Sequence, residues 1–263
     1  MRFLGVDLAW NDVNPSGVAL LGGRRFPLHL REIPQTLPSH DTVLNWIARH
    51  VAHHRAAVGV DAPLLGLDRG GRRGCDNEIS RRFGRYHAST HSPPRVPALS
   101  RLVRRLVRAY GLEALGPGFA PRSAHPAVRE VYPNAFQVRL FALDQARGMT
   151  ILKYKQRKFA DTHGWAVEGL RPFVERCAEA LGGRYVATSG PAWAALIEHR
   201  PRAGMTGREL KAIEDRWDAV LCALAVALEF FEPGSMRFYC DEPGQWSGGY
   251  ILAPALVDGS LSP

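Results

Sequence analysis

The chain has 263 residues, 46% of them hydrophobic, which is enough for one large core, and we expect a single domain over residues 1–263. No run of 18 apolar residues occurs, and the start lacks the apolar region and cleavage site of a signal peptide, so a membrane-spanning helix and secretion are both unexpected. The four cysteines form no CxxC pair, which favours reduced thiols in a cytoplasmic protein over a disulfide frame or a zinc site.

The formal net charge is +9 at pH 7, and arginine supplies nearly all of the positive charge. Because the arginine guanidinium matches the geometry of phosphate, this composition favours a nucleic acid, DNA or RNA, as a partner. Genome base composition can produce the same arginine content, so charge alone does not decide between the two explanations. The only lysines are Lys153, Lys155, Lys158 and Lys211.

Three short apolar segments open the chain and predict a meander of antiparallel strands. They cover residues 3–10, 16–22 and 26–32, and a glycine pair at 22–23 suits a tight hairpin between the last two. Asp7 interrupts the first segment, where a buried carboxylate is costly unless a cation or a hydrogen bond meets it. We therefore expect Asp7 at the mouth of the sheet, facing a metal ion.

A helix and another strand come next, and this strand also ends in an acid. The apolar stripe of residues 42–54 predicts an amphipathic helix. Within residues 57–64, a short apolar strand ends in Asp61, and Pro63 stops the ladder just beyond it. Open α/β sheets bind their ligands at this end of the strands, so Asp61 is a second candidate for the site.

Residues 66–126 are a basic insertion of loops and two predicted helices, at 76–85 and 97–110. Long irregular segments in a compact domain are usually functional or mobile. The second helix carries four arginines opposite its apolar stripe, and a solvated helix face is the best explanation for them.

Two histidine pairs have the four-residue spacing that can bind zinc on a helix. Neither pair contains the glutamate of an HExxH motif, so zinc is not expected. His50 and His54 are best explained as surface residues. His87 and His91 lie in the basic insertion, where a contact with substrate stays open.

The second half of the chain adds a third strand with a carboxylate and a long helix. Glu130 lies in the strand predicted at 127–133, and a helix capped by Asn134 follows it. In the longest predicted helix, Asp215 and Asp218 lie one turn apart on one face. The remaining expected elements are the end of the Asn134 helix at about 147, helices at 167–181 and 206–231, and strands at 236–240 and 249–252.

Carboxylates from four separate elements form the candidate site. Brought together, they repel strongly unless cations compensate them, and Mg²⁺ or Mn²⁺ with oxygen ligands does so. Two such ions about 3.5–4 Å apart can clamp the attacking and leaving oxygens of a phosphodiester. The alternative is that each acid caps a helix or forms a salt bridge separately. The candidate catalytic and metal-binding acids are Asp7, Asp61, Glu130 and Asp218, with Asp215 as a further metal ligand.

Basic residues near these acids are candidates for binding the flanking phosphates of a substrate. Three come from the insertion and two from the lysine cluster: Arg73, Arg81, Arg82, Lys153 and Lys155.

Four motifs occur along the chain in the order GVDLAW, VGVDAPL, REVYPNAF and DRWDAVLCALAVA, and KYKQRKFADTHGWAVEGL and GGYILAP accompany them. In this order and spacing they resemble DUF429, a bacterial and archaeal family predicted to be a nuclease of the ribonuclease H-like fold. The resemblance covers nearly the whole chain. It implies an α/β fold with a mixed five-stranded sheet, its first three strands antiparallel, flanked by helices and carrying helical and loop insertions.

The same resemblance implies that Asp7, Asp61, Glu130 and Asp218 bind the metal ions. The DAVLCALA match favours Asp218 as the ligand from the long helix, but Asp215 can share its role or take its place.

Three functions are consistent with the sequence. The first is a divalent-metal-dependent nuclease, with Asp7 and Asp218 as main ligands and Asp61 and Glu130 completing the site. The second is a nucleotide-binding phosphotransferase-like protein of related fold, against which the lack of a glycine-rich phosphate loop argues. The third is a non-catalytic nucleic-acid-binding protein. The substrate, its strandedness and the oligomeric state are left open.

Overall fold

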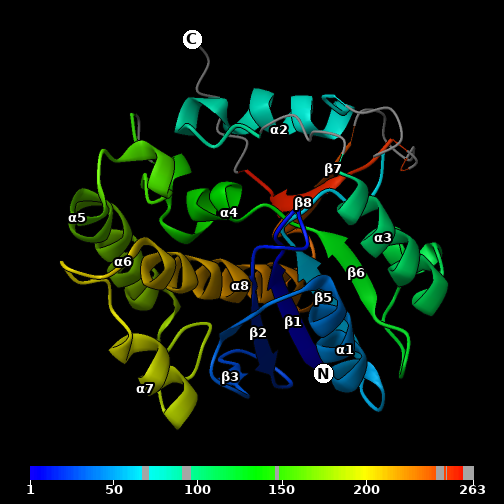
Figure 1. The fold of residues 1–263 in the computed structure, drawn as a ribbon. Helices are drawn as coiled ribbons and strands as arrows, with labels where there is room; N and C mark the ends of the chain where they lie inside the picture. Colours follow the sequence, from blue (N-terminus) through cyan, green and yellow to red (C-terminus); the bar gives the residue numbers. More distant parts are fainter. Residues whose placement is uncertain (67–70, 91–95, 146–147, 241–245, 247, 257–263) are drawn as a thin grey trace.

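A mixed sheet forms the centre of the computed structural model, which describes residues 1–66, 71–90, 96–145, 148–240, 246 and 248–256 (Figure 1). Its strand order is β3-β2-β1-β5-β6, and β4 pairs with β2 beside this path. β1 is antiparallel to β2 and parallel to β5, and β6 continues the parallel part. The strands are β1 Arg2–Asp7, β2 Ser16–Gly22, β3 His29–Leu30, β4 Gln35–Leu37, β5 Ala56–Val60 and β6 Ala127–Glu130.

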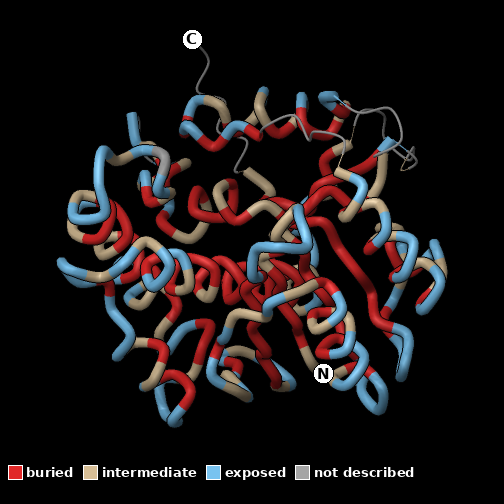
Figure 2. Tube along the Cα trace, in the orientation of Figure 1, coloured by how far each residue is buried: buried red, intermediate tan, exposed pale blue. Residues whose placement is uncertain are grey.

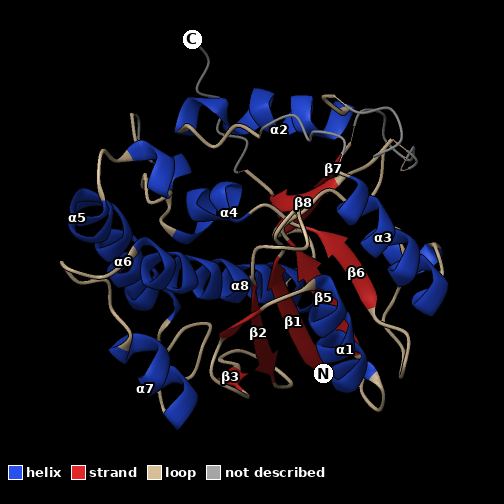
Figure 3. Cartoon of the chain, in the orientation of Figure 1, coloured by secondary structure: helices blue, strands red, loops and turns tan. Residues whose placement is uncertain are grey.

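Helices surround this sheet, and a separate antiparallel pair of strands lies near the end of the chain (Figure 3). The helices are α1 His40–Val51, α2 Gly74–Phe83, α3 Pro97–Tyr110, α4 Pro133–Leu140, α5 Thr162–Gly164, α6 Arg171–Leu181, α7 Pro191–Glu198 and α8 Gly207–Phe231, and the strand pair is β7 Met236–Tyr239 with β8 Ile251–Pro254. None of the helices among the described residues has the length and apolarity needed to cross a lipid bilayer.

The central strands β1, β2, β5 and β6 are buried along most of their length (Figure 2). Because successive side chains of a strand point to opposite faces, the core is divided into two clusters, one on each face of the sheet. Leu4 and Val6 of β1 pack with the apolar sides of α1 and α3. Phe3 leaves β1 on the opposite face and packs in the cluster that contains α8, α4 and α6. A strand with both faces covered is apolar at nearly every position, which explains the short apolar runs in the sequence.

The long helix α8 lies against β1, β2 and β5 at the distance of a backbone contact. A Cβ atom added to Gly5 would overlap the carbonyl oxygen of Ala219, and one added to Gly59 would overlap that of Cys222. Gly5 and Gly59 are partners in the parallel ladder, so they form one continuous groove across two strands. The absence of side chains there lets α8 approach the sheet.

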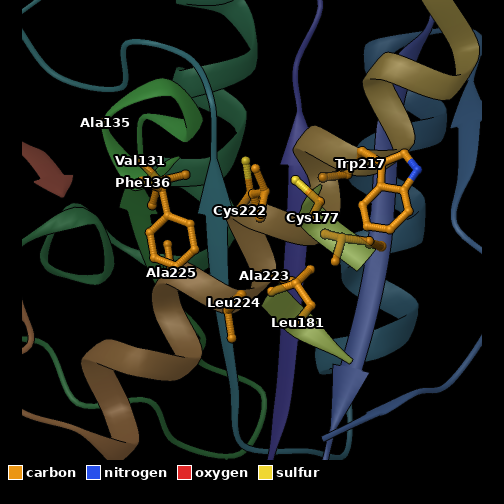
Figure 4. Close-up of a cluster of buried hydrophobic side chains, with 14 of the residues drawn as sticks. Val131, Ala135, Phe136, Cys177, Leu181, Trp217, Cys222, Ala223, Leu224 and Ala225 are labelled. Atoms are coloured by element: carbon orange, nitrogen blue, oxygen red, sulfur yellow. The ribbon is translucent and has the colours of Figure 1, made fainter. Parts of the chain in front are cut away.

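The other side of α8 is covered by further helices, so the helix is buried along most of its length. Figure 4 shows side chains of α8, among them Trp217 and Cys222, gathered with Phe136 of α4 and Cys177 of α6. A helix apolar nearly all round is typical of a central core helix. Its carboxylates therefore need a special explanation.

Several element boundaries differ from those expected. The third strand, expected at 26–32, is only the two residues of β3, because the link from β2 runs through residues 23–28 and is no two-residue hairpin. The helix expected over 134–147 ends at Leu140, since Ala142 adopts a left-handed backbone conformation with φ of 53°. Its first turn is set by Pro133 and not by an Asn134 cap.

Two further differences concern the helices after residue 160. The helix expected from residue 167 begins as an α-helix only at Arg171, because residues 165–170 form a π-helical turn before it. The helix α7 was not expected at all; its eight residues are too few for a clear periodic pattern.

Replacement of Gly5 by alanine tests the close packing of α8. We expect G5A to lower the free energy of unfolding by about 1–3 kcal/mol or more, since the new methyl group must push the backbone of α8 away from β1. Chemical denaturation measures the change. The control is G118A, because a Cβ at this exposed glycine meets no atom within 4 Å. Equal stability of both variants would contradict the packing described here.

Candidate functional site

Two aspartates meet at one edge of the sheet because β1 and β5 are parallel and in register. Val6 pairs with Val60, and the Asp61 backbone N–H donates a 2.8 Å hydrogen bond to the Val6 carbonyl oxygen. Asp7 and Asp61 therefore end neighbouring strands at the same level. Asp7 lies two residues after Gly5, and Asp61 lies two residues after Gly59. Residues two apart in a strand point to the same face, so both carboxylates lie on the side of the sheet that α8 covers.

The start of α8 presents a charged stripe to this edge. Lys211, Glu214, Asp215 and Asp218 are spaced by three and four residues, so they lie on one face of the helix. The carboxyl groups of Asp215 and Asp7 share a hydrogen bond. The five acids that converge here, called the carboxylate cluster below, are Asp7, Asp61, Glu214, Asp215 and Asp218.

Two lysines and a tyrosine hold the α8 part of the cluster. The Lys155 ammonium forms ion pairs with Asp218 and, at 3.2 Å, with Oε1 of Glu214. Lys211 donates to the same Glu214 oxygen at 2.8 Å and also pairs with Asp215. Tyr154 donates its hydroxyl to Oδ1 of Asp218 at 2.7 Å. Ammonium groups thus bridge the carboxylates that would otherwise repel each other.

Negative charge in the cluster nevertheless exceeds positive charge, and the pKa values reflect it. Burial, reinforced by Asp7, raises the pKa of Asp215 to about 9. Burial also raises the pKa of Asp218 to about 6, although Lys155 opposes the shift. The pKa of Asp61 is raised well above its ordinary value by burial and by Asp7. Carboxylates that resist ionisation in this way are typical of functional sites.

Glu130 lies at the same edge but belongs to a different network. Glu130 lies two residues after Val128 in β6, so the two side chains point to the same face, and Val128 packs on the side of the sheet that carries α1 and α3. There the Arg73 guanidinium binds both of its oxygens, at 2.8 and 2.5 Å, and the Leu64 backbone N–H adds a 2.9 Å hydrogen bond. Arg73 also binds Asp76 at 3.0 Å. Glu130 is thus held by a buried arginine.

Both networks border one cavity of about 390 Å³. Asp7, Asp61 and Glu214 reach it from the carboxylate cluster, and Glu130 reaches it with Arg73. Asp215 and Asp218 lie behind this surface, with exposed fractions of 2% and 0%. The cavity is therefore an acidic cleft with cationic groups in its walls.

The cluster has the chemistry, though not yet the arrangement, of a site for a hard divalent cation. Across the described residues, no three His, Cys, Asp or Glu side chains already surround one point as metal ligands do. The donors are carboxylate oxygens, which Mg²⁺ and Mn²⁺ prefer. Oε2 of Glu214 is buried without a hydrogen-bond partner. An orphaned oxygen in a cluster with excess negative charge fits a cation that is shared with Asp7 and Asp61.

Comparison with known proteins gives one match. The family model described as "Protein of unknown function (DUF429)" matches residues 5–244. The chain belongs to the DUF429 family. Neither the search of curated proteins nor the search of solved structures found a match. Membership confirms the family resemblance of the sequence motifs, while the activity of this DUF429 chain has to be argued from its site.

The acids expected from the sequence of this DUF429 chain are partly brought together. Asp7, Asp61, Asp215 and Asp218 converge, so both acids of α8 lie in the carboxylate cluster. Glu130 lines the same cavity but is occupied by Arg73.

The basic residues expected to bind substrate have several different surroundings. Arg73 is buried in ion pairs, and Lys155 lies inside the carboxylate cluster. Arg81 and Arg82 form salt bridges with Glu78 on α2. Of these five expected residues, Lys153 alone is exposed and lines one of the two cavities described here.

The histidines are also distributed differently from one another. His50 is half-buried and contacts Glu32, whereas His54 is exposed, so only His54 is a plain surface residue. His87 lines the second cavity, and His91 lies outside the described residues.

Three residues of the candidate site were not predicted from the sequence, namely Glu214, Lys211 and Tyr154. A signal for the first two was present. In KAIEDRWD the charged positions 211, 214, 215 and 218 follow the period of a helix and interrupt an otherwise apolar stripe. Tyr154 had no such signal, because its partner Asp218 lies 64 residues away.

Replacement of Arg73 separates a structural role from substrate binding. We expect R73A to lower the free energy of unfolding by about 3–5 kcal/mol, because Glu130 and Asp76 lose their buried counterion. Thermal or chemical denaturation measures the loss. In the control R81A, a side chain that is 64% exposed is removed, and the cost should stay below about 1 kcal/mol. A fully stable R73A protein would show that the arginine is not needed for folding.

Removal of the Asp7 charge should stabilise the protein in the presence of chelator. Because the pKa of Asp215 is raised in the folded state, this residue destabilises the fold at a pH where the unfolded chain would ionise it. The destabilisation is absent below the unfolded-state pKa of about 3.9 and grows as the pH rises toward 9. We expect D7N to raise the melting temperature at pH 8 by about 2–4 °C or more, the effect of roughly 1 kcal/mol, and to gain less at pH 5.

The matched control for this comparison is E175Q, which neutralises an exposed acid on α6. Its melting temperature should follow that of the wild type at both pH values. A destabilised D7N protein at pH 8 would mean that Asp7 is compensated in the folded state by partners other than a divalent cation.

Proposed function

We propose that the chain is a divalent-metal-dependent nuclease that hydrolyses phosphodiester bonds in nucleic acid. The observation that carries the proposal is the convergence of five carboxylates, three of them buried, beside an open cleft, where two ammonium groups form the salt bridges found among the described residues. Such an excess of buried negative charge is costly to folding and persists only where a function needs it.

The sheet topology supports a ribonuclease H-like fold for this proposal. That fold is expected to begin with antiparallel strands and to continue with parallel ones. β1 and β2 form such an antiparallel pair, β3 extends it, and β5 and β6 add the parallel part. The acids at positions 7 and 61 then lie at the edge where α/β sheets bind ligands.

The residues that would hold the cation are Asp7, Asp61 and Glu214 at the cleft, with Asp215 and Asp218 behind them. When bound there, a divalent cation would supply positive charge beside the phosphodiester and would lower the pKa of a nearby water. Asp7 is central, because it shares a hydrogen bond with Asp215 and acts electrostatically on Asp61 and Asp218.

Lys155 and Lys211 have a second role in this proposal. Without a cation their ammonium groups keep the acids of α8 in place. Both side chains also line the cleft, so they can donate hydrogen bonds to the non-bridging oxygens of a bound phosphate. Their pKa values are raised by the surrounding carboxylates, which outweigh the effect of burial, so both stay protonated at neutral pH.

The charge on the rest of the molecule agrees with a nucleic-acid substrate. The formal net charge is +9 despite the acidic cleft. The four arginines of α3 are exposed, as expected for a solvated helix face, and one of them, Arg105, pairs with Asp41 of α1. Exposed arginines attract a polyanion over several ångströms and make its binding dependent on salt.

Cleavage assays with single-stranded, double-stranded and branched DNA and RNA in Mg²⁺ or Mn²⁺ test the proposed function. We expect cleavage by the wild type and a loss of about 100-fold or more in D7N and D61N, since each variant removes a charged oxygen donor at the cleft. The E175Q control should keep full activity. If the wild type cuts none of these substrates with either metal, the chain is not a nuclease.

A further inference from the structure

A second cavity of about 290 Å³ adjoins the acidic cleft. The two share Tyr132, Asn134 and Lys155 in their walls. The second cavity is otherwise lined by His87 and Ser89 and by residues 151–154 and 158. Its size is that of a site for one small ligand and not of a groove for a strand.

The charge of this second cavity is opposite to that of the cleft. Its described lining contains His87 and three lysines but no carboxylate. Lys155 is already paired with Asp218 and Glu214. Lys153 and Lys158 are exposed and form no ion pair within the part of the chain that the structure describes. Two uncompensated ammonium groups in one small cavity favour an anionic ligand.

A chain of hydrogen bonds fixes the wall between the two cavities. The fully buried Gln137 accepts the Leu152 backbone N–H at 3.1 Å and donates to Oδ1 of Asn134 at 3.3 Å. Asn134 donates to the Tyr132 hydroxyl at 3.2 Å, and this hydroxyl donates to the Ser89 carbonyl oxygen at 2.9 Å. The network orients polar groups toward both cavities before any ligand arrives, which lowers the entropic cost of binding.

His87 contributes backbone strain at the same place. Its φ of 62° is in the left-handed region, which is uncommon for residues other than glycine. The His87 N–H donates to the Gly84 carbonyl oxygen at 2.9 Å, and Ile151 is tied to the adjacent Tyr86 by a 3.0 Å backbone hydrogen bond. Strained residues that a protein retains concentrate at ligand sites.

We propose that the second cavity binds a terminal phosphate monoester of the nucleic acid, on the nucleotide next to the bond that is cut. Lys153, Lys158 and His87 donate to the phosphate oxygens, and the neighbouring phosphodiester reaches the carboxylate cluster across the Tyr132–Asn134 wall. The small volume of the cavity favours a strand end over an internal nucleotide. This assignment rests on the proposed nuclease function and specifies its substrate as a strand with a phosphorylated end.

Binding is tested without metal, so that it does not depend on cleavage. The chelator-treated full chain is titrated calorimetrically with nucleoside 5′- and 3′-monophosphates and with the corresponding nucleosides. We expect at least one monophosphate to bind about 10-fold or more tightly than its nucleoside, and K158A and K153A each to lose most of that difference. The control R49A removes an exposed arginine on α1, on the other side of the sheet, and should bind like the wild type.

Cleavage provides the second readout. Oligonucleotides with a 5′-phosphate, a 3′-phosphate or hydroxyl ends are compared in Mn²⁺, and we expect about 10-fold faster cutting of one phosphorylated form, with the preference lost in K158A. If no oligonucleotide is cut but the monophosphate binds through Lys158, the proposed nuclease function fails and the phosphate site stands. If strands are cut but monophosphate and nucleoside bind alike, or K158A changes neither readout, the phosphate site is refuted.

Discussion

The close contact between α8 and the sheet is the constraint on which the site depends. Gly5 and Gly59 present no side chain to the helix, and Gly17 of β2 likewise faces the backbone of Asp215. This approach brings the acids of α8 against the acids that end β1 and β5. A larger residue at any of these glycines would separate the two halves of the carboxylate cluster, so packing and chemistry are coupled in this fold.

The cluster illustrates how a stable core can contain an unfavourable arrangement of charge. Most of α8 is buried among apolar side chains, and these contacts stabilise the fold enough to offset the destabilising effect of the acids near the start of the helix. Lys155, Lys211 and Tyr154 limit the cost by binding the carboxylates that lie deepest. At the cleft, Asp7 and Asp61 form no salt bridge within the part of the chain that the structure describes, which is the arrangement expected of groups that meet a cation or a substrate.

The sequence predicted the structure best where a pattern of neighbouring residues also determines where those residues lie in the fold. An apolar run that ends in an acid predicted the places of Asp7 and Asp61, because parallel strands in register bring their carboxyl ends together. The helix α8 was predicted almost to the residue from its apolar stripe. Pattern did not reveal that Glu130 binds Arg73, since the partners are 57 residues apart and Glu130 leaves the sheet on the other face. The short β3 was overestimated because the apolar residues at 26–28 pack in the core from a loop.

The segment that carries Tyr154 connects the acidic cleft with the helical layer behind it. The Tyr154 ring stacks on Phe173 of α6 at 3.7 Å between centroids, and its carbonyl oxygen accepts a 2.7 Å hydrogen bond from the indole of Trp165. Lys155 follows Tyr154 in the chain, so a ligand that displaces its ammonium from Asp218 changes the charge beside a tyrosine whose backbone is hydrogen-bonded to a buried tryptophan. The intrinsic fluorescence of the chain, to which Trp165 contributes as one of six tryptophans, is therefore expected to respond when a ligand enters the cleft.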